Sequence, residues 1–209
     1  MEFRLTYEGP LPATQGNEVG SARSPKLQQK HDIRTKLHPQ LKRLWEITPF
    51  LKTGKRSGPS ALITEESEDP IDLRLGALAA KYGRDGWGFV PLVTEQLNLI
   101  CGLDILVLRP QTPGDVISAG DLDNRLKTLF DALRIPLPNE RYSERIPQPD
   151  EKPYFFCLLE DDKLITKVSV ETDQLLEFVS PDRNDDDVRL IIAVRLRPYE
   201  MHLGNMQFG

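Results

Sequence analysis

The strongest pattern in this chain is a helix placed between two strands. Over Gly120–Arg134, leucine and phenylalanine recur at intervals of three and four residues, which is the period of one buried helix face. The apolar run Leu97–Leu108 precedes this segment and the apolar run Tyr154–Leu159 follows it, and both have the length of strands. A strand, a helix and a second strand in this order predict helices packed on a sheet, which excludes an all-helical or an all-β fold.

Further segments extend the same architecture. Phe3–Glu8 and Ile165–Glu171 alternate between apolar and polar residues, as half-buried strands do, and Val188–Leu196 is a strong apolar strand. Lys26–Glu46 has helical periodicity, but Pro39 predicts a break or kink just before it. We therefore expect an α/β (α+β) fold, with a mixed β-sheet and helices packed on one or both of its faces.

The length of 209 residues suits one domain, residues 1–209, with two added segments. The first, about 48–96, contains a short helix around Asp72–Lys81 and a glycine-rich turn over 83–88. We expect it to be an insertion that packs on the main sheet. The second, about 135–153, contains five prolines and is too long for a simple connection, so it is either mobile or functional.

Composition indicates a soluble protein of a reducing compartment. No apolar run approaches the roughly 20 residues that a membrane-spanning helix needs, so no membrane partner is expected. The N-terminus alternates like a strand and does not resemble a signal peptide. Cys101 and Cys157 both lie in apolar runs without a neighbouring metal-ligating residue, as buried core cysteines do. We expect a cytoplasmic protein.

Positive charge is concentrated in one stretch of an acidic chain. The formal net charge is −5, yet residues 22–56 contain ten basic and only two acidic residues. A basic stretch on an acidic body is typical of a local phosphate-binding face. A solvated helix with many lysines accounts for the composition equally well, and the sequence leaves both interpretations open.

Acidic residues gather at the start of the predicted helix and after the strand that follows it. Asp121, Asp123 and Lys127 lie at the helix start, where Asp123 and Lys127 share a face because they are four residues apart. Asp161 and Asp162 follow the strand. If the strand end meets the helix start, these carboxylates form an open oxygen cage of the kind that Mg²⁺ prefers. Lys127 would then stabilise charge on a bound phosphate.

The same residues also have a purely structural interpretation. Asp121 suits the N-cap position of the helix. Asp123, Lys127 and Asp131 could form an exposed ladder of ion pairs, each contributing about 0.3–0.5 kcal/mol. The later acidic pair could be a solvated turn. Spacing alone does not decide between the two interpretations.

Several other functional motifs are excluded. A calcium-binding EF-hand loop fails because Arg125 stands where the next ligand is needed. The chain has no glycine-rich phosphate loop and no serine-centred elbow. His31, His38 and His202 form no recognisable ligand pair or triad.

The segment Asp121–Leu133 resembles the central motif of the RusA-type Holliday-junction resolvases. That family has an Asp-x-Asp-Asn-x-x-Lys pattern followed by Asp-Ala-Leu, and the segment reads DLDNRLKTLFDAL. Leu159–Ile165 is similar to the second acidic element of the family, in which an Asp-Asp pair precedes an apolar strand. The opening strand, the turn Gly9–Pro12 and the basic helix are also similar to the N-terminus of the family.

The resemblance implies a Mg²⁺-dependent endonuclease, with Mn²⁺ as a substitute metal, from a phage, a prophage or another mobile element. A nucleoid-associated homodimer would resolve four-way (Holliday) or related branched DNA junctions, using two sites to nick opposed strands. Carried over by motif position, the metal-binding carboxylates would be Asp121, Asp123 and Asp162, with Asp161 as the alternative to Asp162. Lys127 would be the essential lysine.

DNA contacts are expected from the basic stretch and from positions near the motif. The candidate DNA-binding residues are Lys26, Lys30, Arg34, Lys36, Arg125 and Arg141.

The chain departs from the family in its length, because family members are typically much shorter. The added segment 135–153 lies between the two halves of the expected site, so it could carry Arg141 and Arg145 onto DNA or cover the site. Two alternatives to an enzyme remain. One is a non-catalytic RusA-like module that binds nucleic acid. The other is a protein-interaction or regulatory subunit that uses the acidic surface and the proline-rich segment.

Overall fold

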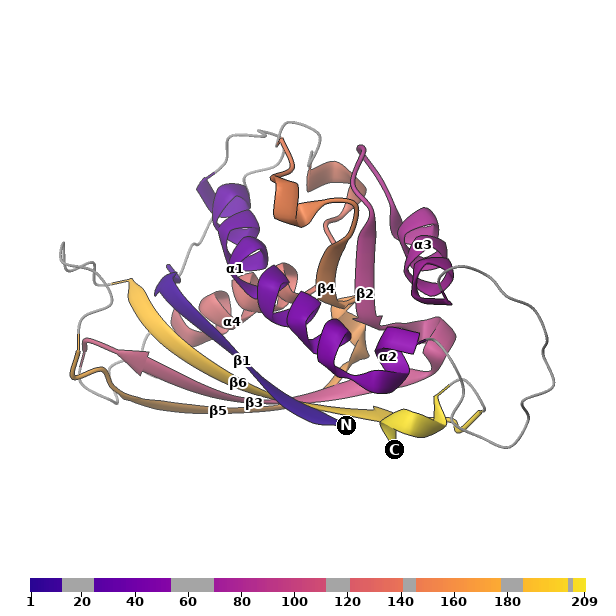
Figure 1. Cartoon of the computed structure of the whole chain (residues 1–209). Helices are drawn as coiled ribbons and strands as arrows, with labels where there is room; N and C mark the ends of the chain where they lie inside the picture. The colour runs from indigo at the N-terminus through magenta and orange to yellow at the C-terminus, as the bar shows by residue number, and fades with distance from the viewer. Residues whose placement is uncertain (13–24, 54–69, 112–120, 141–145, 178–185, 203–204) are drawn as a thin grey trace.

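The strands of the protein form two sheets (Figure 1). A computed structural model describes residues 1–12, 25–53, 70–111, 121–140, 146–177, 186–202 and 205–209. The main sheet has four strands in the order β1-β6-β3-β5, and a second sheet pairs β2 with β4. The strands are β1 (Glu2–Pro10), β2 (Phe89–Val93), β3 (Leu99–Arg109), β4 (Phe155–Leu159), β5 (Ile165–Gln174) and β6 (Asp187–Pro198).

The main sheet is mixed, as the sequence predicts. β6 pairs antiparallel with both β1 and β3, whereas β5 runs parallel to β3 at the edge of the sheet. β3 buries every second residue, because successive side chains of a strand point to opposite faces. On β6 the buried residues at the same face include Leu190, Ile192 and Val194. One face of this sheet therefore supplies much of the hydrophobic core.

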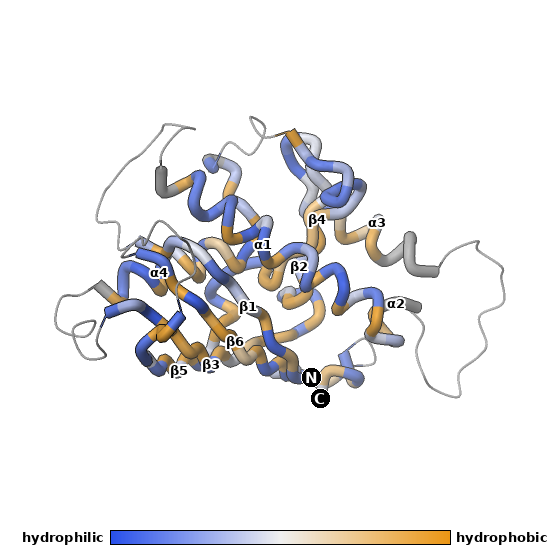
Figure 2. The backbone as a smooth tube through the Cα atoms, turned by 60° about the vertical axis from the view of Figure 1, so that its left-hand side comes forward, coloured by the Kyte–Doolittle hydropathy of each residue, from blue (hydrophilic) through white to orange (hydrophobic). Residues whose placement is uncertain are grey.

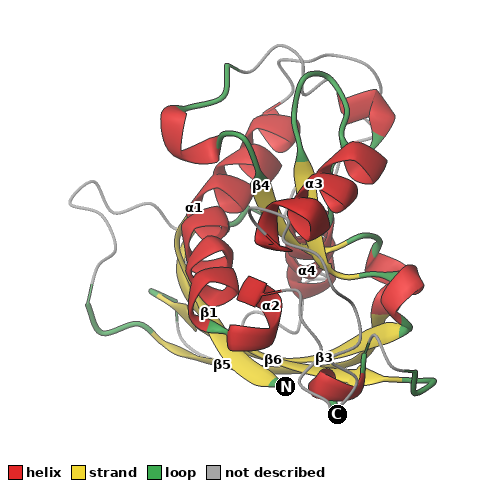
Figure 3. Ribbon diagram, turned by 45° about the vertical axis from the view of Figure 1, so that its right-hand side comes forward, coloured by secondary structure: helices red, strands yellow, loops and turns green. Residues whose placement is uncertain are grey.

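The described helices all lie on one side of the main sheet (Figures 1 and 3). α1 packs against β1, β4 and α4, and α3 packs against β2. Figure 2 shows hydrophobic positions along the strands of the main sheet and at intervals along α1. No helix among the described residues is long and apolar enough to cross a membrane. The helices are α1 (Pro25–Ile47), α2 (Pro49–Thr53), α3 (Pro70–Tyr82) and α4 (Asp121–Leu133), with short 3₁₀ turns at η1 (Glu95–Leu97), η2 (Pro138–Glu140), η4 (Pro149–Glu151), η5 (Asp162–Leu164) and η6 (Met206–Phe208).

The second sheet corrects the expectation for residues 48–96. This segment contributes β2, which pairs in parallel with β4, so it is more than an insertion packed on the main sheet. All five residues of each strand are buried. A parallel strand that is buried on both faces has a continuous apolar sequence without alternation. β2 is also short and contains Pro91, so it carries no periodic signal that would identify it.

Pro39 lies inside α1, and the helix continues through it. A proline in a helix interior costs about 3 kcal/mol. Burial of a large apolar side chain contributes roughly 1.5–3 kcal/mol. Four such side chains on one face of α1 lie in the core, so packing outweighs the proline. They are Ile33, Leu37, Leu41 and Trp45.

His38 joins α1 to β4 as a neutral ring. Its side chain is 1% exposed and stacks on Phe155 with ring centroids 4.6 Å apart. Nδ1 accepts a hydrogen bond from the backbone N–H of Phe156 at 2.9 Å, which assigns the proton to Nε2. Nε2 lies 3.2 Å from the carbonyl oxygen of Asp150 and donates to it. Burial, with a smaller effect of the Lys42 ammonium, lowers the pKa of His38 below its ordinary value.

This contact makes the stability of the protein dependent on pH. A lowered folded pKa means that the unfolded chain binds the proton more readily. The free energy of unfolding should therefore be constant above about pH 6.5 and should fall as the pH drops from there through the folded pKa of His38. Urea unfolding of the wild type and of His38→Gln between pH 8 and pH 5 measures this. The prediction fails if the variant keeps the full slope of the wild type.

Candidate functional site

Two residues of the expected site stand on the outer face of α4. Asp123 and Lys127 are both exposed, whereas Leu129 and Leu133 on the inner face are buried. Neither Asp123 nor Lys127 forms a hydrogen bond or an ion pair with another residue that the structure describes. Asp121 is the first residue of α4, and its side chain lies outside the described atoms. The start of α4 thus presents a carboxylate and an ammonium one turn apart, neither of them paired within the described part of the chain.

Arg125 fixes this end of α4 to the main sheet. Arg125 is only 5% exposed. The guanidinium donates to the carbonyl oxygen of Leu11 and, at 2.9 Å, to Oδ1 of Asp186. Leu11 follows β1 and Asp186 precedes β6, so one side chain ties the helix to two neighbouring strands. The expectation that Arg125 binds DNA is corrected, because its donors are used inside the protein.

Asp131 belongs to an ionic cluster between α4 and α1, and not to an exposed ladder with Lys127. Its carboxylate lies 2.7 Å from Lys30 Nζ and 2.9 Å from a nitrogen of Arg134. Burial alone would raise the pKa of Asp131, but Lys30 and Arg134 together outweigh burial and hold the pKa below its ordinary value of 3.8. The stabilisation is complete above that pH and is lost as the pH falls through the lower folded pKa.

Glu140 completes the ionic cluster and holds Arg34. The Arg34 side chain is 1% exposed, and its guanidinium lies 2.8 Å from the carboxylate of Glu140. It also donates to the backbone carbonyls of Asp131 at 2.6 Å and Arg134 at 3.2 Å. Lys30 lies 3.5 Å from the same carboxylate. Sequence reasoning missed Glu140. Its partners lie on α4, about six residues earlier in the chain, and on α1, about 100 residues earlier, and nothing in a proline-rich segment marks one acid as the partner of both helices.

Two of the expected DNA-binding residues of α1 are paired with acids inside the protein. Lys30 and Arg34 belong to the ionic cluster. Lys36 donates to the carbonyl oxygen of Glu8 and lies 5.2 Å from the ring centroid of Tyr7. The charges of Lys30 and Arg34 are thus compensated by acids within the fold, which corrects the expectation that these two residues contact phosphates. Lys36 is exposed, and its contact with a carbonyl oxygen neutralises no charge, so its contact with phosphate stays a prediction. The side chain of Lys26 and all of Arg141 and Arg145 lie outside the described residues.

The later acidic pair forms a turn that contacts α4. Asp161 precedes η5, and its Oδ1 accepts a hydrogen bond from the N–H of Lys163 at 3.0 Å. Asp162 is exposed. Lys163 forms an exposed ion pair with Glu95 at 2.6 Å, which joins this turn to η1. η5 contacts both α4 and β3, so the two acidic elements of the sequence come to the same helix.

The two elements approach α4 from different ends. β4, which leads into the acidic pair, meets the end of α4, where the N–H of Ile135 donates to the carbonyl oxygen of Leu159 at 2.9 Å. Asp123 is eleven residues before Arg134, which corresponds to about 16 Å along a helix axis. The chain thus reaches Asp162 from the C-terminal end of α4, whereas Asp123 belongs to its N-terminal turn.

The donor types suit Mg²⁺, which binds oxygen ligands and often takes only one or two protein carboxylates beside water and phosphate. Asp123 offers such a carboxylate without a competing partner among the described residues. Within the part of the chain that the structure describes, no three His, Cys, Asp or Glu side chains form a group able to hold a metal ion. Asp121 and Asp123 are therefore the candidate metal-binding carboxylates in the first turn of α4.

The ionic cluster predicts a large cost for removing Glu140. Glu140→Gln leaves Arg34 buried without its countercharge, and breaking a buried ion pair costs about 3–5 kcal/mol. The matched change Glu46→Gln removes an exposed partner of Arg43 and should cost less than about 1 kcal/mol. Denaturant unfolding of both variants compares the two costs. Equal, small effects would show that the ionic cluster does not stabilise the fold.

Comparison of the chain with protein-family models, with curated proteins and with solved structures gives no match in any of the three.

Proposed function

We propose that the protein is a divalent-metal-dependent endonuclease that nicks four-way or related branched DNA junctions. The observation that carries the proposal is the outer face of α4, where Asp123 and Lys127 are exposed and unpaired among the described residues. The same segment, which begins at Asp121, resembles the central motif of the RusA-type resolvases. This resemblance suggests a chemical role for the face.

The other charged side chains near Asp123 and Lys127 differ from these two, because they are paired within the protein. Arg125, Asp131 and Arg134 all bond to other parts of the protein. Asp123 and Lys127 have the spacing of a helical ion pair, which would contribute only about 0.3–0.5 kcal/mol, and do not form one. Pairing within the described residues therefore does not occupy these two charges, and both are available to a ligand.

Each residue has a distinct task in the proposed reaction. The carboxylates of Asp121 and Asp123 would hold Mg²⁺, which supplies water activation and charge neutralisation when bound. The resemblance makes Asp162, with Asp161 as the alternative, the candidate third carboxylate. Its turn contacts α4, but the chain reaches it from the C-terminal end of that helix. Lys127 would hold a non-bridging phosphate oxygen and stabilise the charge that develops on it. The free N–H groups and the dipole at the start of α4 favour the same anion.

A four-way junction has opposed strands related by symmetry, so paired nicks call for two equivalent sites. A homodimer supplies them with a twofold axis. β5 supports this part of the proposal, because β3 is its only paired neighbour within the described residues. An unpaired strand edge is a common surface for association with another chain.

Asp123→Asn should abolish cleavage of an end-labelled four-way junction in Mg²⁺ or Mn²⁺, while junction binding persists because one negative charge near the phosphates is lost. Asp85→Asn is the matched control, since Asp85 is exposed in a turn with φ of 54°, a conformation that asparagine adopts readily. Cleavage at the wild-type rate by Asp123→Asn would remove this residue from the site. Wild-type binding without any cleavage would instead support a non-catalytic module.

Lys127→Met tests the role in charge stabilisation. Loss of one preorganised charge contact should lower kcat by about 100–1,000-fold. Junction affinity should change only a few-fold, because an exposed lysine is one of many phosphate contacts. Single-turnover cleavage and anisotropy titrations separate the two effects. An affinity loss that accounts for the whole decrease in rate would make Lys127 a binding residue only.

A further inference from the structure

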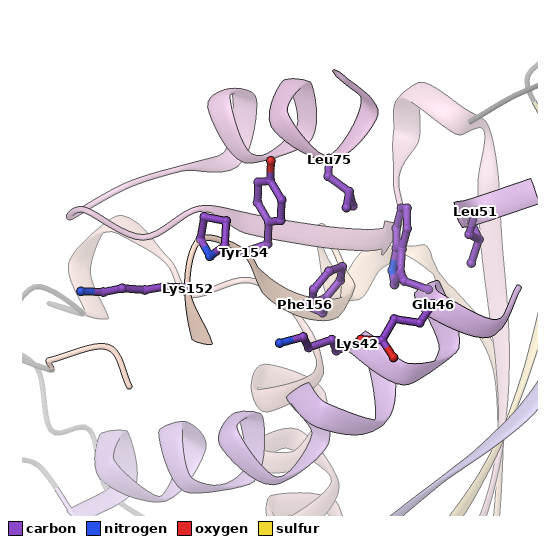
Figure 4. Close-up of a pocket in the computed structure, with 9 residues that line it drawn as sticks. Lys42, Glu46, Leu51, Leu75, Lys152, Tyr154 and Phe156 are labelled. Atoms are coloured by element: carbon purple, nitrogen blue, oxygen red, sulfur yellow. The ribbon is translucent and has the colours of Figure 1, made fainter. Parts of the chain in front are cut away.

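An apolar pocket lies away from α4, where the second half of α1 meets α2, α3 and the start of β4 (Figure 4). Its volume is about 220 Å³. Trp45, Leu75, Tyr154 and Phe156 form much of its wall. Typical sites for drug-sized molecules enclose about 300–1,000 Å³, so this pocket suits a single ring system.

Trp45 leaves a hydrogen-bond donor unused in the wall of this pocket. The residue is 3% exposed, and its indole N–H is buried without an acceptor among the described residues. A buried donor without a partner is unfavourable, and native structures rarely keep one without a reason. A planar ring in this pocket would stack against the aromatic wall.

Two lysines give one side of the pocket a positive charge. Figure 4 shows Lys42 and Lys152 with their ammonium groups directed to the same side. Lys42 donates to the carbonyl oxygen of Asp150 at 3.1 Å, which neutralises no charge. Lys152 is exposed and has no partner in the part of the chain that the structure describes. Glu46 also lines the pocket, but Arg43 compensates its charge at 3.2 Å.

We infer that this pocket binds a nucleotide of a DNA strand, with the base in the apolar wall and the phosphate at Lys42 and Lys152. Stacking of bases on aromatic side chains beside cations is the common basis of single-strand binding. A base within a duplex is not accessible to such a pocket, so the ligand must be unpaired or extruded. The inference rests on the proposed function and deepens it, because flaps and forks carry unpaired nucleotides at the branch, and a four-way junction would have to extrude one.

An aromatic side chain of a protein partner would fill the wall equally well. It would bring no phosphate for the two lysines, so a nucleotide fits the charges better. The choice between these occupants is an outcome of the experiment below.

Three variants of the full chain test the pocket. Leu75→Phe fills it, Trp45→Phe removes the N–H but keeps a ring, and Lys152→Gln removes a charge. Lys167→Gln is the matched control, because Lys167 is exposed on β5 and makes only a 3.7 Å ion pair with Asp104. The probes are a fluorescent single-stranded oligonucleotide, a four-way junction and free deoxynucleoside monophosphates, titrated without metal so that binding is measured apart from cleavage.

Leu75→Phe should weaken oligonucleotide binding by about 5–150-fold, which is the contribution of one stacked base. Trp45→Phe and Lys152→Gln should weaken it less, and Lys167→Gln should leave it unchanged. Unchanged affinity in all three pocket variants, with circular dichroism showing that they fold, would overturn the inference. Free monophosphates that bind as tightly as the oligonucleotide would overturn the assignment to a DNA strand.

Cleavage in the same proteins separates this inference from the proposed function. If Asp123→Asn cleaves normally while Leu75→Phe still loses oligonucleotide affinity, the proposed site on α4 fails and the pocket stands. If Asp123→Asn is inactive and the pocket variants bind as the wild type does, the pocket inference fails and the site on α4 stands.

Discussion

The ionic cluster between α1 and α4 is the interaction on which the rest of the arrangement depends. Arg34 lies buried against Glu140, and Lys30 and Arg134 share the two acids of the cluster. Burying charges is costly, and a mutual arrangement of this kind is stable only when every partner is present. Because α4 is held by this cluster near one end and by Arg125 near the other, its rotation is fixed, and the face that bears Asp123 and Lys127 is turned outward.

These internal ion pairs change how the basic stretch, residues 22–56, should be interpreted. An excess of lysine and arginine normally suggests a surface for phosphates. Here Lys30 and Arg34 neutralise acids inside the fold, and Lys36 satisfies a backbone carbonyl. The cations that remain toward solvent on this side of the molecule, such as Lys42 and Lys152, border the apolar pocket. Under the pocket inference, the nucleic-acid surface lies along the second half of α1.

Sequence patterns predicted the elements whose periodicity is strong. The amphipathic face of α4 and the apolar runs of β3 and β6 identified the sheet and the helix that carries the candidate site. β2 could not be predicted, because a short strand buried on both faces has no period. The partners of Arg34 and Trp45 could not be predicted either, because they are decided by packing between segments that are far apart in the chain. Motif spacing therefore placed Asp123 and Lys127 on one face, but could not tell which nearby charges were already used.

α1 connects the apolar pocket to the C-terminal end of α4, the helix that bears Asp123 and Lys127. Arg34 fixes the helix to α4, and Trp45 lines the pocket eleven residues later, which corresponds to about 16 Å of helix. His38 pins the middle of the helix to β4, so the spacing does not depend on the helix alone. Under both proposals, a nucleotide held in the pocket would set which phosphate reaches the outer face of α4, and the position of the cut would follow from the branch and not from the base sequence.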